Sequence, residues 1–328
     1  MKLFFHIICF LFCGSLYAQT VSGTVYDSVT KEPLLGASVY FEGTTIGGIT
    51  NEQGKFSLYS EINSTSQLVV TYLGYTDAVF TLSGNKPLTI YLTPKEESLD
   101  EVVVTATSLF TREELLAAFR TQFLGTTKAG QSCEILNEDA LRLYYNASKK
   151  QLTVKANEVL RIKNPYLGYE IRFRLYDCKI SYFSTSIKSY DVQQSYYAGT
   201  SFFVDEKKDV RKYKKRREEV YEGSSLHFMR TVATEQWDEE DFVIYKKGLP
   251  VYPKTHFVVS DTLGIKKVQL TNPVTVLYDK KKRSEVRPKY THYTIDGFGN
   301  FYPPDALIFS GLMGQQRLGD ALPLDYGL

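Results

Sequence analysis

Residues 20–94 consist of short β-forming runs separated by turn signals, and this pattern constrains the fold more than any other feature of the chain. In residues 67–72, for example, β-branched and aromatic residues dominate. The intervening segments carry Gly, Asn and Pro, the residues that turn backbones require. Apolar residues nowhere recur here at helical spacing. The pattern predicts an all-β sandwich of about seven strands over residues 19–94.

Several motifs of this stretch occur in the order of a known module. They are Gly23-Thr24-Val25-Tyr26-Asp27, Pro33-Leu34-Leu35-Gly36-Ala37-Ser38-Val39, Gly43-Thr44-Thr45, Asn51-Glu52-Gln53-Gly54-Lys55-Phe56 and Tyr72-Leu73-Gly74-Tyr75. They resemble the carboxypeptidase-regulatory-like module, a transthyretin-like β-sandwich that precedes glycan-uptake outer-membrane receptors and other Bacteroidota-type envelope proteins. The module is non-catalytic, so the resemblance implies no active site.

The first 18 residues have the layout of a secretory signal peptide. Lys2 provides the positive start, an apolar run follows, and Ala18 is the small residue before the expected cleavage site. The run is shorter than the roughly 20 apolar residues that span a bilayer. A lipoprotein would place its acylated cysteine at Cys13, but the bulky Phe12 precedes it. We therefore expect export to the periplasm or cell envelope, with no transmembrane segment after cleavage.

A charged linker, residues 95–101, leads into the β-branched residues Val102, Val103, Val104 and Thr105. In the uptake receptors that this region resembles, a similar segment is seized by an energy-transducing partner. The chain after it is too short for a plug and a large barrel at roughly 10 residues per strand. Residues 95–107 are therefore interpreted as a linker or an extended strand, and residues 102–105 as a candidate partner strand. Such a charged linker predicts few contacts between the sandwich and the rest.

Residues 108–328 combine helical and strand patterns. Thr111 and Glu114 form a capping box, and Gly125 is a plausible end of that helix. A second helix is expected over residues 225–234, and nine further runs read as strands. The prediction is an α+β domain with a mainly antiparallel sheet. Motifs such as Asn164-Pro165-Tyr166-Leu167-Gly168-Tyr169 resemble the C-terminal half of envelope proteins that are characterised only by their regulatory-like module, which implies no activity.

Cysteine usage leaves one redox question open. Removal of the leader leaves Cys133 and Cys178, which in an oxidising compartment either form a disulfide or stay as two inert buried thiols. Spacing alone does not decide between them.

Catalytic signatures are weak. None of the histidines His227, His256 and His292 has a paired ligand at metal spacing, so no metal or other cofactor is expected. Ser224 and His227 are three residues apart on the expected second helix, but an N-cap serine explains Ser224 better. The acidic run after Trp237 is interpreted as a solvated loop, because adjacent carboxylates rarely converge on one sugar bond.

Eight basic residues occur between positions 207 and 217. Among them, Lys212, Lys214, Lys215, Arg216 and Arg217 are candidate ligands for an anion. Because an exported chain does not meet nucleic acid, anionic glycolipid or phosphate at the outer membrane is the expected partner. A solvated hairpin edge that discourages strand addition explains the same run without a ligand.

These observations predict a non-catalytic envelope binding or scaffold protein that docks to outer-membrane or other envelope proteins, or to a surface glycan. With 39 basic and 37 acidic side chains, the chain has almost no net charge that would attract nucleic acid. The alternative is a glycan- or peptide-processing hydrolase whose site is assembled from residues distant in sequence. A concave pocket that gathers ionisable side chains in residues 108–328 would favour that alternative.

Overall fold

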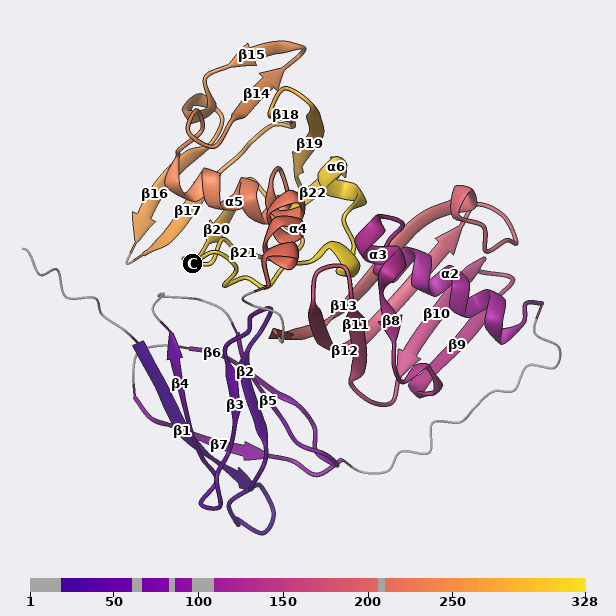
Figure 1. Ribbon diagram of the computed structural model, residues 1–328, viewed down its shortest axis with the longest axis vertical. Coiled ribbons are helices and arrows are strands. Elements are labelled where there is room, and N and C mark those ends of the chain that lie inside the picture. The colour runs from indigo at the N-terminus through magenta and orange to yellow at the C-terminus, as the bar shows by residue number, and fades with distance from the viewer. Residues whose placement is uncertain (1–18, 61–66, 83–85, 96–108, 206–209, 263) are drawn as a thin grey trace, which may run out of the picture.

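The computed structural model describes residues 19–60, 67–82, 86–95, 109–205, 210–262 and 264–328 (Figure 1). The fold is mainly β, as predicted, and it contains several antiparallel sheets. The expected signal peptide and the candidate partner strand at residues 102–105 lie outside the described residues.

The N-terminal module is a seven-stranded β-sandwich. Its strands are β1 (Gln19–Asp27), β2 (Ser38–Phe41), β3 (Gly47–Ile49), β4 (Lys55–Ser60), β5 (Gln67–Thr71), β6 (Ala78–Thr81) and β7 (Leu88–Leu92). One sheet has the order β4-β1-β7 and the other β3-β2-β5-β6. All pairs are antiparallel except β1 with β7, which is parallel. The sandwich expected from the strand–turn pattern is confirmed.

Strict alternation along the strands builds the sandwich core. In β4, Phe56 and Leu58 are buried while Lys55, Ser57 and Tyr59 are exposed. This two-residue period directs alternate side chains to opposite faces of the sheet. The inward residues of both sheets form one apolar cluster, with Val25, Val39, Leu68 and Leu92 among its fully buried members.

The central module is one antiparallel sheet with helices on it. Its elements are α2 (Arg112–Leu124), α3 (Lys128–Ser132), β8 (Glu134–Ile135), η1 (Glu138–Ala140), β9 (Leu141–Asn146), β10 (Gln151–Ala156), β11 (Leu160–Asn164), β12 (Tyr169–Tyr182), η2 (Ser189–Asp191) and β13 (Val192–Asp205). The long strand β12 pairs with β11 and then β10 along one edge and with β13 along the other. The capping box at Thr111 and the end at Gly125 are as predicted.

The C-terminal module has two antiparallel sheets and its own core. Its elements are α4 (Arg211–Tyr221), α5 (Ser225–Thr234), β14 (Phe242–Lys246), β15 (Leu249–Val251), η3 (Pro253–Thr255), β16 (Val258–Thr262), β17 (Ile265–Gln269), β18 (Val274–Tyr278), β19 (Lys282–Pro288), β20 (His292–Ile295), β21 (Phe301–Tyr302), β22 (Leu307–Gly311), α6 (Leu312–Gln315) and η4 (Leu318–Asp320). The sheet orders are β15-β14-β18-β19-β22 and β16-β17-β20-β21.

Residues 109–328 thus contain two separate apolar clusters. The first joins α2 to the central sheet through Phe119 and Phe123. The second joins α5 to the C-terminal sheets through Phe228 and Val232. Figure 1 shows the three modules as distinct bodies, with the C-terminus between the sandwich and the C-terminal module.

Candidate functional site

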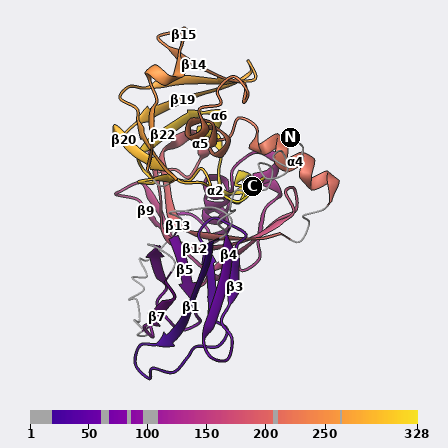
Figure 2. The ribbon, with the colours of Figure 1, turned by 90° about the vertical axis from the view of Figure 1, so that its left-hand side faces the viewer.

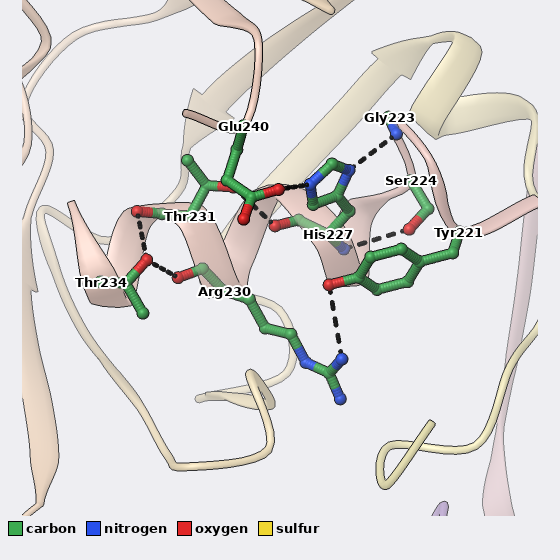
Figure 3. Close-up of polar contacts among 8 residues, drawn as sticks. All are labelled: Tyr221, Gly223, Ser224, His227, Arg230, Thr231, Thr234 and Glu240. Atoms are coloured by element: carbon green, nitrogen blue, oxygen red, sulfur yellow. Dashed lines mark hydrogen bonds and ion pairs between the residues drawn. The ribbon is translucent and has the colours of Figure 1, made fainter. Parts of the chain in front are cut away.

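The strongest catalytic candidate of the sequence, Ser224 with His227, is a structural feature (Figure 3). Ser224 Oγ accepts the backbone N–H of His227 at 3.1 Å and so caps α5. The N–H of Gly223 donates to His227 Nδ1 at 3.0 Å, which leaves the proton on Nε2 to be donated to Glu240 at 2.8 Å. Burial lowers the pKa of His227. The serine caps the helix as expected, and its hydroxyl does not bond the ring.

The acidic run after Trp237 does not form a carboxylate pair. Trp237 is buried in the C-terminal core, Glu240 bonds His227, and Asp238 and Glu239 are exposed. Within the described ranges, no three His, Cys, Asp or Glu side chains are grouped to hold a metal ion.

The described part of the basic run, from Arg211 to Arg217, lies in the helix α4 instead of the hairpin edge that the sequence suggested. Arg217 is buried and binds Asp205 with both terminal nitrogens, at 2.7 and 2.8 Å. Arg216 donates to the carbonyl of Tyr166 at 3.1 Å and stacks on its ring. Arg217 is therefore removed from the candidate anion ligands, because its charge is already matched inside the fold.

The three lysines of the candidate anion set, Lys212, Lys214 and Lys215, are exposed on α4. Arg216 and Arg217 of the same helix instead contact the central module and hold the helix in place.

The two cysteines are free thiols in the structure, so it contains no Cys133–Cys178 disulfide. Cys133 lies at the end of α3, where its thiol donates to the carbonyl of Ala129 at 3.3 Å. Cys178 points into the central core from β12. Burial raises the pKa of each thiol to about 12, which makes both of them poor nucleophiles.

The contacts between the sandwich and the central module contradict the expectation that few would form. The outer face of the sheet β3-β2-β5-β6 carries Tyr40 and Val69, which are 8% and 0% exposed. The Tyr40 ring packs on Phe202 of β13, with ring centroids 5.1 Å apart. Next to them, Arg174 of β12 forms an ion pair with Asp77 at 2.7 Å. The β12–β13 pair therefore covers this face of the sandwich.

A carboxylate is buried at the same junction. Glu42 follows β2 and accepts two long hydrogen bonds from Ser201 of β13, at 3.3 and 3.4 Å. Burial raises the pKa of Glu42 to about 7, and the nearby Asp296 of the C-terminal module adds like-charge repulsion. All three modules thus contribute to the environment of one side chain.

The last residues of the chain tie the modules together. The N–H of Leu324 donates to Gly43 of the sandwich at 2.7 Å, and Asp325 accepts the N–H of Thr45 at 2.9 Å. Arg230 of α5 donates to the carbonyls of Leu324 and Tyr326 at 2.7 and 2.8 Å. No local sequence pattern predicts this arrangement, because each bond joins residues far apart in the chain.

A cleft of about 260 Å³ lies between α5, β13 and this C-terminal segment. It gathers the ionisable side chains Arg317 and Asp320 beside Tyr197. Asp320 accepts the hydroxyl of Thr127 at 2.5 Å and the N–H of Arg317 at 3.2 Å. Arg317 itself donates to the carbonyls of Gly314 and Gln316, both at 2.8 Å. These groups are used to hold the segment in place.

The other sheet of the sandwich, β4-β1-β7, keeps an open outer face. Tyr59 of β4 and Tyr91 of β7 are 57% and 50% exposed, and Tyr91 stacks on Tyr26 with centroids 5.6 Å apart. Among the described strands, β4 and β7 each pair with β1 alone, so both are edges of their sheet. We call this surface, defined by Tyr26, Tyr59 and Tyr91, the tyrosine face.

Comparison with known proteins identifies the N-terminal module. Residues 21–104 match the CarboxypepD_reg-like domain, and the N-terminal module is a domain of this kind. Over 85 residues the chain is 38% identical to the TonB-dependent receptor SusC of Bacteroides thetaiotaomicron. This alignment covers 26% of the chain and only 8% of the receptor. The motif-based assignment of the module is therefore confirmed.

Among solved structures, the chain resembles two interface mutants of a type II cohesin–X-dockerin complex from Acetivibrio cellulolyticus. Each is 23% identical, with a TM-score of 0.20, and covers 23% of this chain and 56% or 58% of its own. A similarity at this score carries no argument about function. Within the described part of the chain, no helix is both long enough and apolar enough to span a membrane.

Proposed function

We propose that this chain is a non-catalytic binding or scaffold protein of the cell envelope, which docks outer-membrane proteins or cell-surface polymers. The observation that carries the proposal is the CarboxypepD_reg-like module and its 38% identity to part of a TonB-dependent receptor. Because the alignment covers only 8% of that receptor, it supports a shared N-terminal module and does not support a shared receptor activity. The leader-like residues 1–18 support export to the envelope.

In this proposal the sandwich docks through the surface that the fold leaves open. One face is covered by β12–β13, while the tyrosine face and the edge strands β4 and β7 remain available. An edge strand binds an extended partner by backbone hydrogen bonds and needs no catalytic residue. Tyrosines give such a surface large contact area at low conformational cost.

The segment of residues 102–105 is proposed to be the extended strand that the chain itself donates to a partner. It is β-branched, follows the charged linker, and its first three residues fall within the 21–104 domain match. This pairing uses the same backbone chemistry as the edge strands.

The hydrolase alternative has less support. Its best candidate is the cleft with Arg317 and Asp320, yet both side chains are engaged in hydrogen bonds that fix the C-terminal segment. A general acid or base must be within reach of a substrate proton, and a carboxylate held by two intramolecular donors is poorly placed for that role.

Deleting residues 102–105 tests the proposal in cells. The tagged variant should lose its association with the envelope fraction while its thermal melt stays unchanged. Deleting residues 96–99, four residues of the linker, is the matched control and should leave the association intact. A lowered melting temperature would assign the segment to the sandwich instead. Unchanged association together with an unchanged melt would refute the docking role of the segment.

A further inference from the structure

The helix α4 carries an arrangement of charge that the fold itself does not require. Its sequence, RKYKKRREEVY, places the bases in the first half and the acids in the second. A helix prefers the opposite order, because its N-terminus carries partial positive charge and its C-terminus partial negative charge. The first turn of α4 contains no acidic residue, and Val210 at the N-cap gives no side-chain hydrogen bond.

Repulsion between neighbouring side chains adds to this cost. Arg211 lies three and four positions before Lys214 and Lys215, so like charges are adjacent on one side of the helix. Like-charged pairs at these spacings destabilise a helix. Lys214 and Lys215 in turn lie four positions before Glu218 and Glu219, a favourable spacing, so the like-charge repulsion is confined to the first half of the helix. Charges that destabilise their own helix in this way are typical of functional surfaces.

Two arginines hold the helix firmly against the central module. Arg217 packs against the paired ends of β12 and β13: it bonds Asp205 and the carbonyl of Leu167, and its guanidinium lies 3.8 Å from the ring centre of Tyr169. Arg216 stacks on Tyr166 at 4.2 Å. The exposed bases are therefore presented on a fixed scaffold.

The C-terminal end of α4 has a cationic partner from another element. Lys282 of β19 donates to the carbonyls of Glu222 and Glu219, at 2.6 and 3.4 Å, and so neutralises the C-terminal end of the helix. At the first half, Arg211, Lys212 and Lys215 are exposed on the outer side. Figure 2 shows α4 at the edge of the molecule, away from the sandwich.

We propose that the exposed bases of the first half of α4, centred on Arg211, Lys212 and Lys215, dock onto a membrane surface of anionic phospholipid. Charge complementarity carries the assignment, because a layer of phosphate headgroups offers many negative charges to a convex basic surface and needs no pocket. Glu218 and Glu219 on the second half restrict the contact to the beginning of the helix. The inference rests on the proposed envelope function, which gives the chain access to a membrane.

The two uses of the molecule occupy different modules. Protein or polymer partners would meet the tyrosine face of the sandwich, and the lipid surface would meet α4, which follows the central sheet. The lipid contact would then orient the chain on the membrane surface, while the sandwich and residues 102–105 provide the association with its partner.

Vesicle flotation tests the proposal. The chain from Gln19 onward, which keeps every described element, is mixed with vesicles of phosphatidylcholine alone or with about 30% phosphatidylglycerol. We expect binding only to the anionic vesicles, and a loss of most binding at 0.5 M salt, because exposed charges are screened there. The double variant K212E/K215E should bind about tenfold more weakly or worse, since each base near an anionic surface contributes appreciably to affinity.

The matched control is K149E/K280E, which makes the same charge change at two exposed turn lysines and should leave binding unchanged. Equal binding of wild type and K212E/K215E would overturn the proposal, as would equal binding to neutral vesicles. Binding to the soluble polyanion alginate with the same affinity and the same loss in K212E/K215E would assign the helix to polyanions in general and also overturn it. None of these outcomes bears on the envelope association tested by deleting residues 102–105, so the two proposals fail separately.

Discussion

Glu42 is the residue whose chemistry the fold alters most visibly. It lies where the sandwich meets β13, accepts hydrogen bonds from Ser201, and has Asp296 and Tyr176 as neighbouring ionisable groups. No basic side chain within the described residues forms an ion pair with it. Its folded pKa of about 7 exceeds the ordinary value of 4.5, because burial disfavours the charged form.

The pH dependence of stability follows from this shift. Between pH 4.5 and about 7 the folded protein keeps the proton on Glu42 and the unfolded chain has lost it, so the free energy of unfolding falls as pH rises through this window. Glu42→Gln should remove this component and stabilise the protein at pH 8. Chemical denaturation at pH 5 and pH 8 measures both effects. Glu52→Gln, at an exposed turn, is the control and should keep the wild-type slope.

At the scale of elements, α4 depends on Arg217. Its guanidinium binds Asp205 through two nitrogens and is 4% exposed, so removing it leaves a largely buried carboxylate without its bidentate partner. Arg217→Ala should cost about 3–5 kcal/mol, the usual loss for a broken buried pair. Lys212→Ala, on the exposed side of the same helix, should change stability by less than about 0.5 kcal/mol. Equal losses in urea unfolding would contradict the anchoring role of Arg217.

The elements that local sequence determines were predictable. The capping box of Thr111 and Glu114 specifies the start of α2, and the helix over residues 225–234 has the predicted bounds. The helix α4 was not predicted, because its inward positions include the charged Arg217 and so hide the apolar spacing on which helix prediction relies. Only the distant Asp205 and Tyr169 make that position favourable.

The candidate site was predictable only in part, for the same reason. The motifs identified the N-terminal module and hence its sheets. Which sheet face stays open depends on β12–β13, and no local pattern reports a contact between Tyr40 and Phe202, which lie far apart in the chain. The division of residues 109–328 into two cores is likewise decided by long-range packing.

At the scale of the whole molecule, the C-terminal segment links all three modules, and Leu324 and Asp325 both contact the sandwich. Asp325→Ala removes the acceptor of the Thr45 N–H, a charge-assisted bond worth roughly 1.5 kcal/mol. Amide exchange at Thr45 should become about tenfold faster, while the amide of Val70 in the sandwich core keeps its protection. Asp238→Ala, at an exposed turn, is the control. Unchanged exchange at Thr45 would show that the segment does not hold the sandwich.

The most direct test of the account is site-specific photo-cross-linking in living cells. The account predicts that a photoreactive residue at Tyr59, on the open tyrosine face, forms an adduct with an envelope protein or surface polymer. The same residue at the buried Tyr40 should cross-link only within the chain, and at Tyr252, 65% exposed on the C-terminal module, it should give no adduct of that size. Absence of the Tyr59 adduct, or the same adduct from Tyr252, would contradict docking through the sandwich.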